Sequence, residues 1–249
     1  MSVPHEPFET AVVTGAGRGF GRAIALALTA AGTRVVGIAR SEPDLRAVRA
    51  EAGGLFTPLA ADATDGTLAA AVLHEHRPDL LVLNAGAVPH MAPVHEQTWE
   101  SFSRNWHTDT RHVFEWTRAA LREPLAPGGV VVSLSSGAAL AGSPLSGGYA
   151  SAKAAVRYLR GYAADEAERA GLGLRFLTLL PQLTPTAGVG SAGVTAYAAR
   201  QGVDRDAFVA GLQPVLTPEQ VAKAVLDLAA DATAAPEHVV GGAGVRPLP

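Results

Sequence analysis

The stretch that decides the fold is residues 11–32, AVVTGAGRGFGRAIALALTAAG, in which a short apolar run leads through a glycine-rich turn into an alanine-rich segment. The run Ala11 to Thr14 is β-branched and almost wholly apolar, which is typical of a strand covered on both faces. The glycines permit a tight turn and let backbone N–H groups approach a pyrophosphate at the positive end of the next helix. Phe20 and Arg22 stand where the pattern Gly-x-Gly-x-x-Gly needs glycine, and a purely structural turn is the alternative interpretation.

The rest of the chain alternates between short apolar runs and alanine-rich helical segments. We expect strands over residues 11–14, 34–39, 55–61, 80–84, 130–135 and 174–180, with a weak last one over 238–240. We expect helices over residues 20–31, 43–52, 67–75, 99–121, 149–170 and 218–230, the second capped by Ser41 or Glu42 and the last opened by Thr217. This order predicts an α/β fold, a doubly wound parallel sheet of the Rossmann type with about seven strands flanked by helices. No linker or repeat divides the sequence, so residues 1–249 are expected to form a single dinucleotide-binding and catalytic domain.

One segment breaks this alternation. Residues 183–214 are rich in Gly, Ala and Thr, are expected to hold at most one or two short helices, and follow the carboxyl end of a predicted strand. A long, weakly structured segment in a compact domain is usually a binding loop. We therefore expect a substrate-binding loop or lid at about residues 183–214, with a plain surface insertion as the alternative.

Composition excludes several classes of function. The 20 basic and 23 acidic residues give a net charge of -3 without a long run of like charge, so a nucleic-acid partner is not expected. The absence of cysteine excludes disulfides and thiolate metal sites and fits a reducing compartment. No apolar stretch approaches the roughly eighteen residues that span a bilayer, and residues 1–9 lack the features of a leader peptide. We expect a cytoplasmic protein with no membrane partner and no metal.

The end of the second predicted strand bears on the choice of nucleotide. Dinucleotide folds usually place an acidic residue there to hold the ribose 2'-hydroxyl, whereas this strand ends in Ala39-Arg40. Arg40, together with Arg18 from the glycine turn, can pair with a 2'-phosphate. A charge-assisted hydrogen bond contributes about 1.5 to 3 kcal/mol, so the two arginines predict roughly a hundredfold preference for NADP(H) over NAD(H). Two solvated arginines are the alternative interpretation.

A tyrosine and a lysine stand four residues apart on the predicted helix 149–170. Tyr149 and Lys153 share one helix face about 5 to 6 Å apart at Cβ, and Ser136 follows the strand before them. Lowering a tyrosine pKa from about 10 to about 7 requires roughly 4 kcal/mol, which two unit charges about 4 Å apart supply at an effective dielectric of about 20. Tyr149 can then exchange a proton with a carbonyl or alcohol oxygen near neutral pH. Taken alone, the pattern Tyr-x-x-x-Lys is more often helix surface than an active site.

These residues occur in a fixed order together with Asn84-Ala85-Gly86, which follows the fourth predicted strand. Over residues 10–231, this order resembles the motifs of the short-chain dehydrogenase/reductase family. The resemblance implies an NADP(H)-dependent oxidoreductase of the carbonyl reductase or alcohol dehydrogenase type, in which hydride passes directly between the nicotinamide and a ketone, aldehyde or alcohol. It also implies that no metal is needed and that the protein is a homo-oligomer, either a tetramer or a dimer.

The resemblance also implies a role for individual residues. Tyr149 matches the general acid/base, Lys153 the residue that lowers its pKa and holds the nicotinamide ribose, and Ser136 the donor that steadies the substrate carbonyl. Asp62 matches the residue that contacts the adenine ring. The full set expected at the cofactor is Thr14, Gly15, Gly17, Arg18, Gly19, Phe20, Gly21, Arg40, Asp62, Ala63, Asn84, Ala85, Gly86, Tyr149, Lys153, Pro181, Gln182 and Thr184.

The sequence departs from the family pattern at four places, the first of which is Leu83, where the family has the first asparagine of Asn-Asn-Ala-Gly. Asp109 stands where the family has its fourth catalytic residue, an asparagine, while Asn105 lies one helical turn earlier. We expect Asp109 either to serve through its backbone carbonyl or to pair with Lys153 and weaken its influence on Tyr149. Gln182 replaces a glycine after the sixth predicted strand, and residues 241–244 lack the usual closing strand pattern.

The substrate is less clearly indicated. The expected pocket walls, residues 90–95, 137–148 and the segment after 183, are mostly small and apolar, which favours a neutral, apolar carbonyl or alcohol. Two alternatives stay open within the same fold. One is an NAD-linked dehydrogenase, dehydratase or epimerase, and the other is a non-catalytic dinucleotide-binding sensor.

Overall fold

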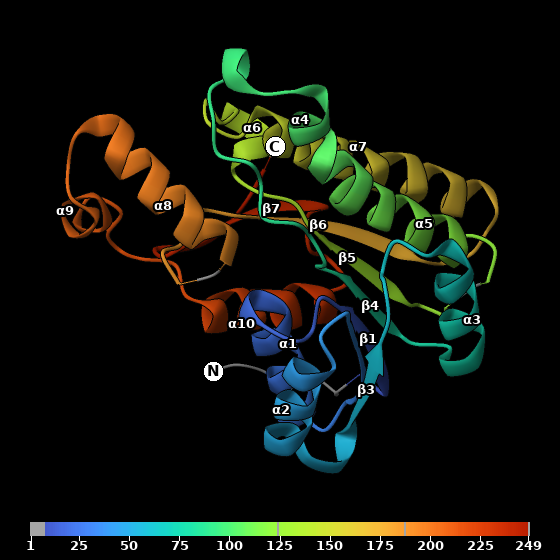
Figure 1. Ribbon diagram of the computed structural model, residues 1–249. Coiled ribbons are helices and arrows are strands. Elements are labelled where there is room, and N and C mark those ends of the chain that lie inside the picture. Colours follow the sequence, from blue (N-terminus) through green and yellow to red (C-terminus); the bar gives the residue numbers. More distant parts are fainter. Residues whose placement is uncertain (1–7, 124, 187, 249) are drawn as a thin grey trace.

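The computed structural model describes residues 8–123, 125–186 and 188–248. Its centre is one sheet of eight strands in the order β3-β2-β1-β4-β5-β6-β7-β8 (Figure 1). The strands are β1 (Thr10–Thr14), β2 (Arg34–Ala39), β3 (Phe56–Ala60), β4 (Leu80–Leu83), β5 (Val130–Leu134), β6 (Arg175–Pro181), β7 (Glu237–Gly241) and β8 (Gly244–Pro247). Neighbouring strands are parallel except β7 and β8. The predicted doubly wound parallel sheet is confirmed, and its seven predicted strands are all present.

The eighth strand corrects the expectation for the C-terminal region. Residues 241–244 close a hairpin in which Gly241 pairs with Gly244 and β8 runs antiparallel to β7. Gly244 has a φ of 129°, a conformation that glycine adopts far more readily than other residues. All four residues of β8 are exposed, so the apolar run that signals a buried strand is missing from its sequence.

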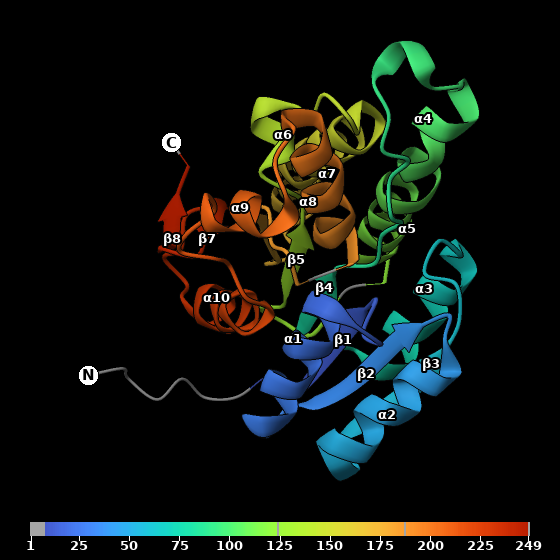
Figure 2. The ribbon, with the colours of Figure 1, turned by 60° about the vertical axis from the view of Figure 1, so that its left-hand side comes forward.

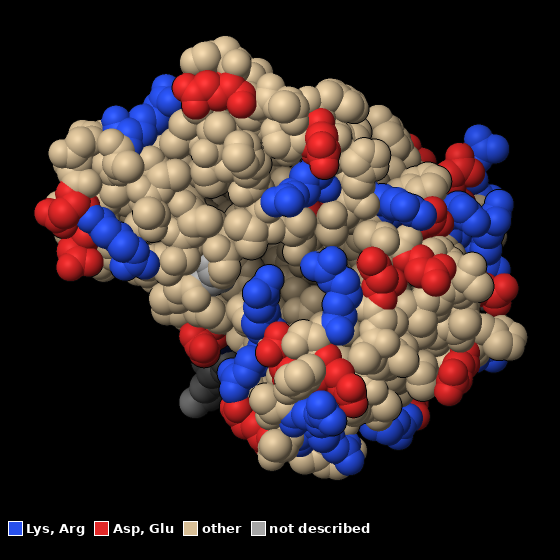
Figure 3. Space-filling model, viewed as in Figure 1, with Lys and Arg blue, Asp and Glu red and all other residues tan. Residues whose placement is uncertain are grey.

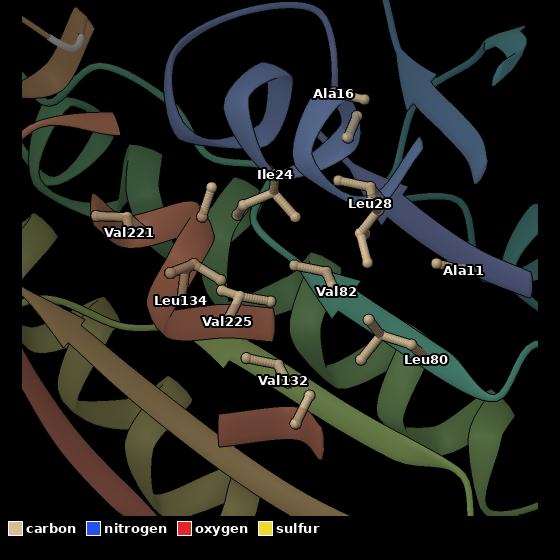
Figure 4. Close-up of a cluster of buried hydrophobic side chains, with 14 of the residues drawn as sticks. Ala11, Ala16, Ile24, Leu28, Leu80, Val82, Val132, Leu134, Val221 and Val225 are labelled. Atoms are coloured by element: carbon tan, nitrogen blue, oxygen red, sulfur yellow. The ribbon is translucent and has the colours of Figure 1, made fainter. Parts of the chain in front are cut away.

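Helices cover both faces of the sheet, as a doubly wound fold requires. One layer contains α1 (Gly19–Ala30), α2 (Glu42–Ala52) and α10 (Pro218–Ala230), and the other contains α3 (Gly66–His76), α5 (Arg111–Ala120) and α7 (Gly147–Arg169) (Figures 1 and 2). In the first layer, Ile24 of α1 and Val225 of α10 pack over Val82 and Val132 of the sheet, and all four are fully buried (Figure 4). The predicted caps are confirmed, because the Ser41 side chain accepts a hydrogen bond at the start of α2 and Thr217 forms a capping box with Gln220 on α10.

The predicted helix 99–121 is a helical run in three parts. It consists of α4 (Trp99–Asn105), a π-helical segment (Trp106–Thr110) and α5. Such a widened turn inside a helix is found frequently at functional sites. The short elements that complete the chain are α6 (Ala138–Ala141) and 3-10 turns at Gly53–Leu55 and Val94–Glu96.

Residues 183–214 are more regular than predicted. They contain α8 (Gly188–Gln201), which is 14 residues long, and α9 (Arg205–Ala210). The glycines that suggested an irregular segment have a packing reason. A Cβ at Gly190 would lie 1.9 Å from the carbonyl oxygen of Thr184, so glycine lets α8 lie directly on the loop that leads into it.

Within the described residues, no helix combines the length and the apolar character needed to cross a membrane.

Candidate active site

A cavity of about 1020 Å³ opens at the carboxyl ends of the parallel strands, where ligands bind in open α/β sheets. On the face seen in Figure 3 the surface is hollowed, and basic side chains lie beside the hollow. Most of the predicted site residues line this one cavity: Gly15, Gly17, Arg18, Gly19, Phe20, Arg40, Asp62, Ala63, Asn84, Ala85, Gly86, Asp109, Ser136, Tyr149, Lys153, Pro181, Gln182 and Thr184. The remaining two, Thr14 and Gly21, are buried and support its wall.

The glycine turn leaves the start of α1 open toward the cavity. Gly15 and Gly19 have φ values of 68° and 55°, and a Cβ at Gly21 would lie 2.2 Å from the carbonyl oxygen of Gly15. The first residues of α1 receive no side-chain cap and include no acidic residue. Their backbone N–H groups and the positive helix end are therefore available to an anion, so the chain fits a pyrophosphate at this position.

Thr14 ties this turn to the loop after β4. Its hydroxyl oxygen accepts hydrogen bonds from the backbone N–H groups of Asn84, at 3.0 Å, and Ala85, at 3.2 Å. The side chain of Asn84 in turn donates to the carbonyl oxygens of Thr14, at 3.1 Å, and Gly15, at 3.3 Å. Hydrogen bonds thus join the glycine turn to the loop after β4, and Thr14 holds these two segments together behind the cavity.

His112 completes this network and was not predicted. Its Nε2 lies 2.9 Å from the Thr14 hydroxyl, and the residue is fully buried. Burial and the charge of Lys153 lower the pKa of His112 to about 3, so the imidazole is neutral at physiological pH. The signal available in the sequence was its position three residues after Asp109, which places both on one side of the helical run.

The end of the cavity near β2 and β3 carries the charges expected at a ribose and an adenine. Arg18 and Arg40 line it and are exposed. Asp62 accepts hydrogen bonds from the Thr64 N–H and hydroxyl, both at 2.9 Å, and the backbone hydrogen bond is the main reason that the pKa of Asp62 is lowered, with Arg40 and Arg111 adding to it. Asp44 also lines the cavity, from the first turn of α2.

Lys153 is held in the cavity wall by three groups. Its Nζ donates to the carbonyl oxygen of Leu134 at 3.0 Å, lies 3.1 Å from Asp109 Oδ2 and is 5.7 Å from the centre of the Tyr149 ring. Ser135 Oγ fixes the backbone by donating to the Lys153 carbonyl oxygen at 2.8 Å. Burial lowers the pKa of Lys153, but Asp109 and Tyr149 raise it more, so that its pKa lies above the usual value and the side chain is an ammonium.

The pKa of Tyr149 differs from the expectation that lysine alone suggested. Burial raises the pKa of Tyr149 above its usual value, and Asp109 raises it further, whereas Lys153 and Ser136 lower it. The Lys153 ammonium therefore offsets only part of the effect of burial and does not bring the pKa of Tyr149 toward neutral pH. Pairing of Lys153 with Asp109, which the sequence left as an alternative, reduces its effect on Tyr149.

Asp109 and Asn105 both contact the backbone of Ala87, the residue after Asn84-Ala85-Gly86. Asp109 Oδ1 accepts from the Ala87 N–H at 2.9 Å, and Asn105 Nδ2 donates to the Ala87 carbonyl oxygen at 2.8 Å. The sequence placed Asn105 one turn too early for the site, but the structure brings it against the same loop.

Much of the remaining lining of the cavity is small or apolar. It includes Val88, Pro89, Met91, Ala138, Ala141, Gly142, Leu183, Val189, Gly193, Leu212 and Pro214. Thr184, expected at the cofactor, donates its hydroxyl to the Leu216 carbonyl oxygen at 2.7 Å and thereby fixes the loop that leads into α8. Tyr197 of α8 hydrogen-bonds through its hydroxyl to Ser143 Oγ, an interaction that was not predicted.

Comparison with known proteins identifies the family of the chain. The family model for short chain dehydrogenases matches residues 9–199. The chain is 35% identical to D-erythrulose reductase of Gallus gallus over 128 residues, 51% of this chain and 52% of that protein. It is 35% identical to L-xylulose reductase of Bos taurus over 148 residues, 59% of this chain and 60% of that protein. It is 33% identical to cis-4-hydroxycyclohexanecarboxylate dehydrogenase of Sinomonas cyclohexanicum over 233 residues, 89% of each chain.

Solved structures agree on the fold. Levodione reductase superposes with a TM-score of 0.81 at 22% identity, covering 94% of this chain and 96% of that one. A 3-ketoacyl-(acyl-carrier-protein) reductase from Brucella melitensis, complexed with NADH, also gives 0.81, at 23% identity, covering 94% and 97%. The chain spans only 52% and 60% of the length of the two sugar reductases. Because the family model nevertheless covers most of the 249 residues, the chain belongs to the short-chain dehydrogenase/reductase family.

Proposed function

We propose that this protein is an NADP(H)-dependent carbonyl reductase or alcohol dehydrogenase with Tyr149 as its general acid/base. The observation that carries the proposal is the shared cavity, in which Ser136, Tyr149 and Lys153 lie with the uncapped start of α1. A bound nicotinamide supplies or accepts the hydride at the substrate carbon. In reduction, Tyr149 donates its proton to the carbonyl oxygen, Ser136 hydrogen-bonds the same oxygen, and Lys153 stabilises the phenolate until solvent returns the proton.

Replacement of Tyr149 tests this chemistry. We expect Tyr149→Phe to lower the rate of NADPH oxidation with a ketone by roughly 10²- to 10⁴-fold, because the proton donor is lost while the ring is kept. The dissociation constant for NADPH, measured by fluorescence, should change little. Turnover near that of the unmodified protein would disprove the acid/base role, and a variant that binds no NADPH would point to a defect in the cavity itself.

We propose NADP(H) as the preferred nucleotide because Arg18 and Arg40 flank the cavity where a 2'-phosphate would lie. One relative, of Sus scrofa, is named carbonyl reductase [NADPH] 2 and is 33% identical over 151 residues. We expect Arg40→Asp to lower the ratio of kcat/KM for NADPH over NADH by roughly tenfold or more, because one charge-assisted hydrogen bond is replaced by repulsion. Arg46→Asp is the control, since Arg46 lies on α2 and does not line the cavity. An unchanged ratio in Arg40→Asp would remove the assignment.

We propose a small, neutral and largely apolar carbonyl or alcohol as substrate, bound beneath a lid formed by residues 183–214. The apolar wall and the position of α8 on the cavity support this. We also propose that the chain forms one domain, since strands from Thr10 to Pro247 share one sheet. A panel that contains a pentulose, a cyclohexanone and a 3-ketoacyl thioester separates the classes that the relatives suggest.

We further propose a homo-oligomer, a dimer or tetramer, located in the cytoplasm. Exposed aromatic side chains on neighbouring helices support association, among them Tyr158 and Tyr162 of α7, each 64% exposed. The cysteine-free composition fits a reducing compartment. Sedimentation of the purified protein and fractionation of cells that express it test the two statements.

A further inference from the structure

Two buried side chains of one helical run hold the backbone of a single residue, Ala87, beside the cavity. Asn105 ends α4 and Asp109 lies in the π-helical segment, and each residue is 1% exposed. The Ala87 N–H donates to Asp109 Oδ1 at 2.9 Å, while Asn105 Nδ2 donates to the Ala87 carbonyl oxygen at 2.8 Å and to Asp109 Oδ1 at 3.2 Å. The donor and the acceptor of Ala87 are thus both satisfied, by different residues.

This division follows from the chemistry of the two side chains. An ionised carboxylate accepts hydrogen bonds but cannot donate one, so Asp109 can serve the Ala87 N–H and not the carbonyl oxygen. The amide of Asn105 supplies the missing donor. A single amide side chain has both a donor and an acceptor. Here Asn105 supplies the donor, and Asp109, four residues later, supplies the acceptor.

The split leaves the second carboxylate oxygen for Lys153. Asp109 Oδ2 lies 3.1 Å from Lys153 Nζ, and the two side chains are 1% and 6% exposed. Gly86 makes room for this oxygen, because a Cβ there would lie 2.8 Å from Oδ2. A buried charge costs several kcal/mol unless it is paired, so the two groups depend on each other.

We infer that Asn105 and Asp109 act as a pair of positioning residues, which together fix the backbone of Ala87 at the cavity wall and give the Lys153 ammonium a buried counter-ion that competes with Tyr149. The inference rests on the proposed role of Tyr149 as the acid/base. Its first consequence concerns the pH at which the phenol ionises. Its second concerns the rigidity of the nucleotide-binding loop over residues 84–87.

The charges that act on Tyr149 come from two elements. Lys153 of α7 favours the phenolate, and Asp109 of the π-helical segment opposes it. The Ser136 hydroxyl after β5 also faces the phenol, while His112 of α5 is neutral and His107 lies exposed at the cavity edge. Removal of the Asp109 charge therefore leaves the ammonium of Lys153 to act on Tyr149 alone.

Asp109→Asn tests the first consequence. The variant keeps an acceptor for the Ala87 N–H and removes the negative charge. We expect Tyr149 to ionise at a pH about one unit lower, which is about tenfold more phenolate at a given pH. The measurement is NMR of 13C-labelled tyrosine, in which Tyr149→Phe identifies one signal among the four tyrosines. In turnover, NADPH-dependent reduction should begin to fall at a correspondingly lower pH, because the protonated phenol is the active form.

Two further variants separate charge from shape. Exchange of the two residues, Asn105→Asp with Asp109→Asn, keeps the net charge but moves the carboxylate away from Lys153, and it should shift Tyr149 in the same direction. Asp227→Asn removes a carboxylate from the exposed pair that Asp227 forms with Lys223, the chain's other lysine, and should shift nothing. A Tyr149 titration unchanged in Asp109→Asn, or equally shifted in Asp227→Asn, would overturn the inference.

Asn105→Ala tests the second consequence. We expect a rise of roughly three- to tenfold in the dissociation constant for NADPH, because about one hydrogen bond that fixes the loop is lost. Gln97→Ala is the matched control. The Gln97 amide donates to the Ala92 carbonyl oxygen at 2.7 Å, farther along the segment between β4 and α4, and neither Gln97 nor Ala92 lines the cavity. An NADPH affinity that is equal in the Asn105 variant and the unmodified protein would overturn this part.

Failure of the proposed function would look different. If no carbonyl compound is reduced yet the Tyr149 signal shifts in Asp109→Asn, the reaction assignment fails and the positioning pair stands. If ketones are reduced and neither the tyrosine signal nor the pH profile moves, the positioning pair fails and the reaction stands.

Discussion

At the scale of single residues, His112 links a buried contact in the site to the stability of the fold. Its pKa falls to about 3 because burial and the charge of Lys153 disfavour protonation. As the pH falls below the ordinary histidine value of about 6.5, the unfolded chain takes up a proton that the folded protein does not. Burial of neutral His112 therefore costs no stability above about pH 6.5. Between about pH 6.5 and 3 it lowers the free energy of unfolding, and at pH 5 this loss is roughly 2 kcal/mol.

Denaturant unfolding at pH 7.5 and pH 5 checks this prediction. We expect His112→Asn to lose less stability between the two pH values than the unmodified protein, whatever the loss of the Thr14 contact costs at pH 7.5. His74→Asn is the control, because the His74 side chain is 81% exposed. An equal pH-dependent loss in both variants would show that His112 titrates freely.

The residues proposed to carry out the chemistry could be found in the sequence because such a reaction needs particular groups at fixed spacing. Tyr149, Lys153 and Ser136 reach one cavity, as their order along the chain suggested. The direction of the Tyr149 pKa could not be predicted, since it depends on burial and on a carboxylate from another element. The contact of Asn105 could not be predicted because its partner, the Ala87 backbone, has no signature in the sequence.

At the scale of elements, the start of α7 depends on a close approach to α4. A Cβ at Gly148 would lie 1.9 Å from the carbonyl oxygen of Phe102. Gly148→Ala therefore has to displace the first turn of α7, which carries Tyr149. We expect a loss of roughly 1 to 3 kcal/mol in the free energy of unfolding, together with a lower kcat.

A second glycine of the same helix is a natural control. Apart from its two chain neighbours and the nearby backbone of α7 itself, no described atom lies within 4 Å of the position that a Cβ would take at Gly161. Gly161→Ala should raise the free energy of unfolding by up to about 1 kcal/mol and leave kcat unchanged, because alanine is the better helix former. Thermal unfolding and steady-state kinetics of both variants measure the contrast. If both substitutions behave alike, the contact with α4 does not position α7.

These two glycines also explain which elements could be predicted. Strands and caps follow from local patterns, so β2 and α10 have the bounds that the sequence suggested. A glycine inside a helix is ambiguous, because only the tertiary neighbour decides whether it breaks the helix or permits contact. Gly190 of α8 is such a case, and residues 183–214 were consequently expected to be less regular than they are.

At the scale of the whole molecule, the proposed lid and the body of the protein meet over the cavity. The order of the strands along the sheet changes direction between β1 and β4, and the cavity opens at this point. In Figure 2, α8 lies in front of the ends of the central strands and beside α6 and α7. The Tyr197 hydroxyl of α8 contacts Ser143 Oγ and accepts from the Leu145 N–H at 3.3 Å, so one side chain joins the lid to the loop before α7.

Loss of this one hydroxyl should loosen the lid without altering the acid/base. We expect Tyr197→Phe to raise KM for the carbonyl substrate by roughly tenfold, since about one to two hydrogen bonds that hold α8 over the cavity are lost, while kcat changes little. Hydrogen exchange over residues 188–201 should become faster in the variant. Tyr162→Phe is the control, because Tyr162 is exposed on α7 and does not line the cavity. If Tyr197→Phe lowers kcat and leaves exchange unchanged, the hydroxyl acts on the reaction directly, and α8 is held over the cavity by its buried face alone.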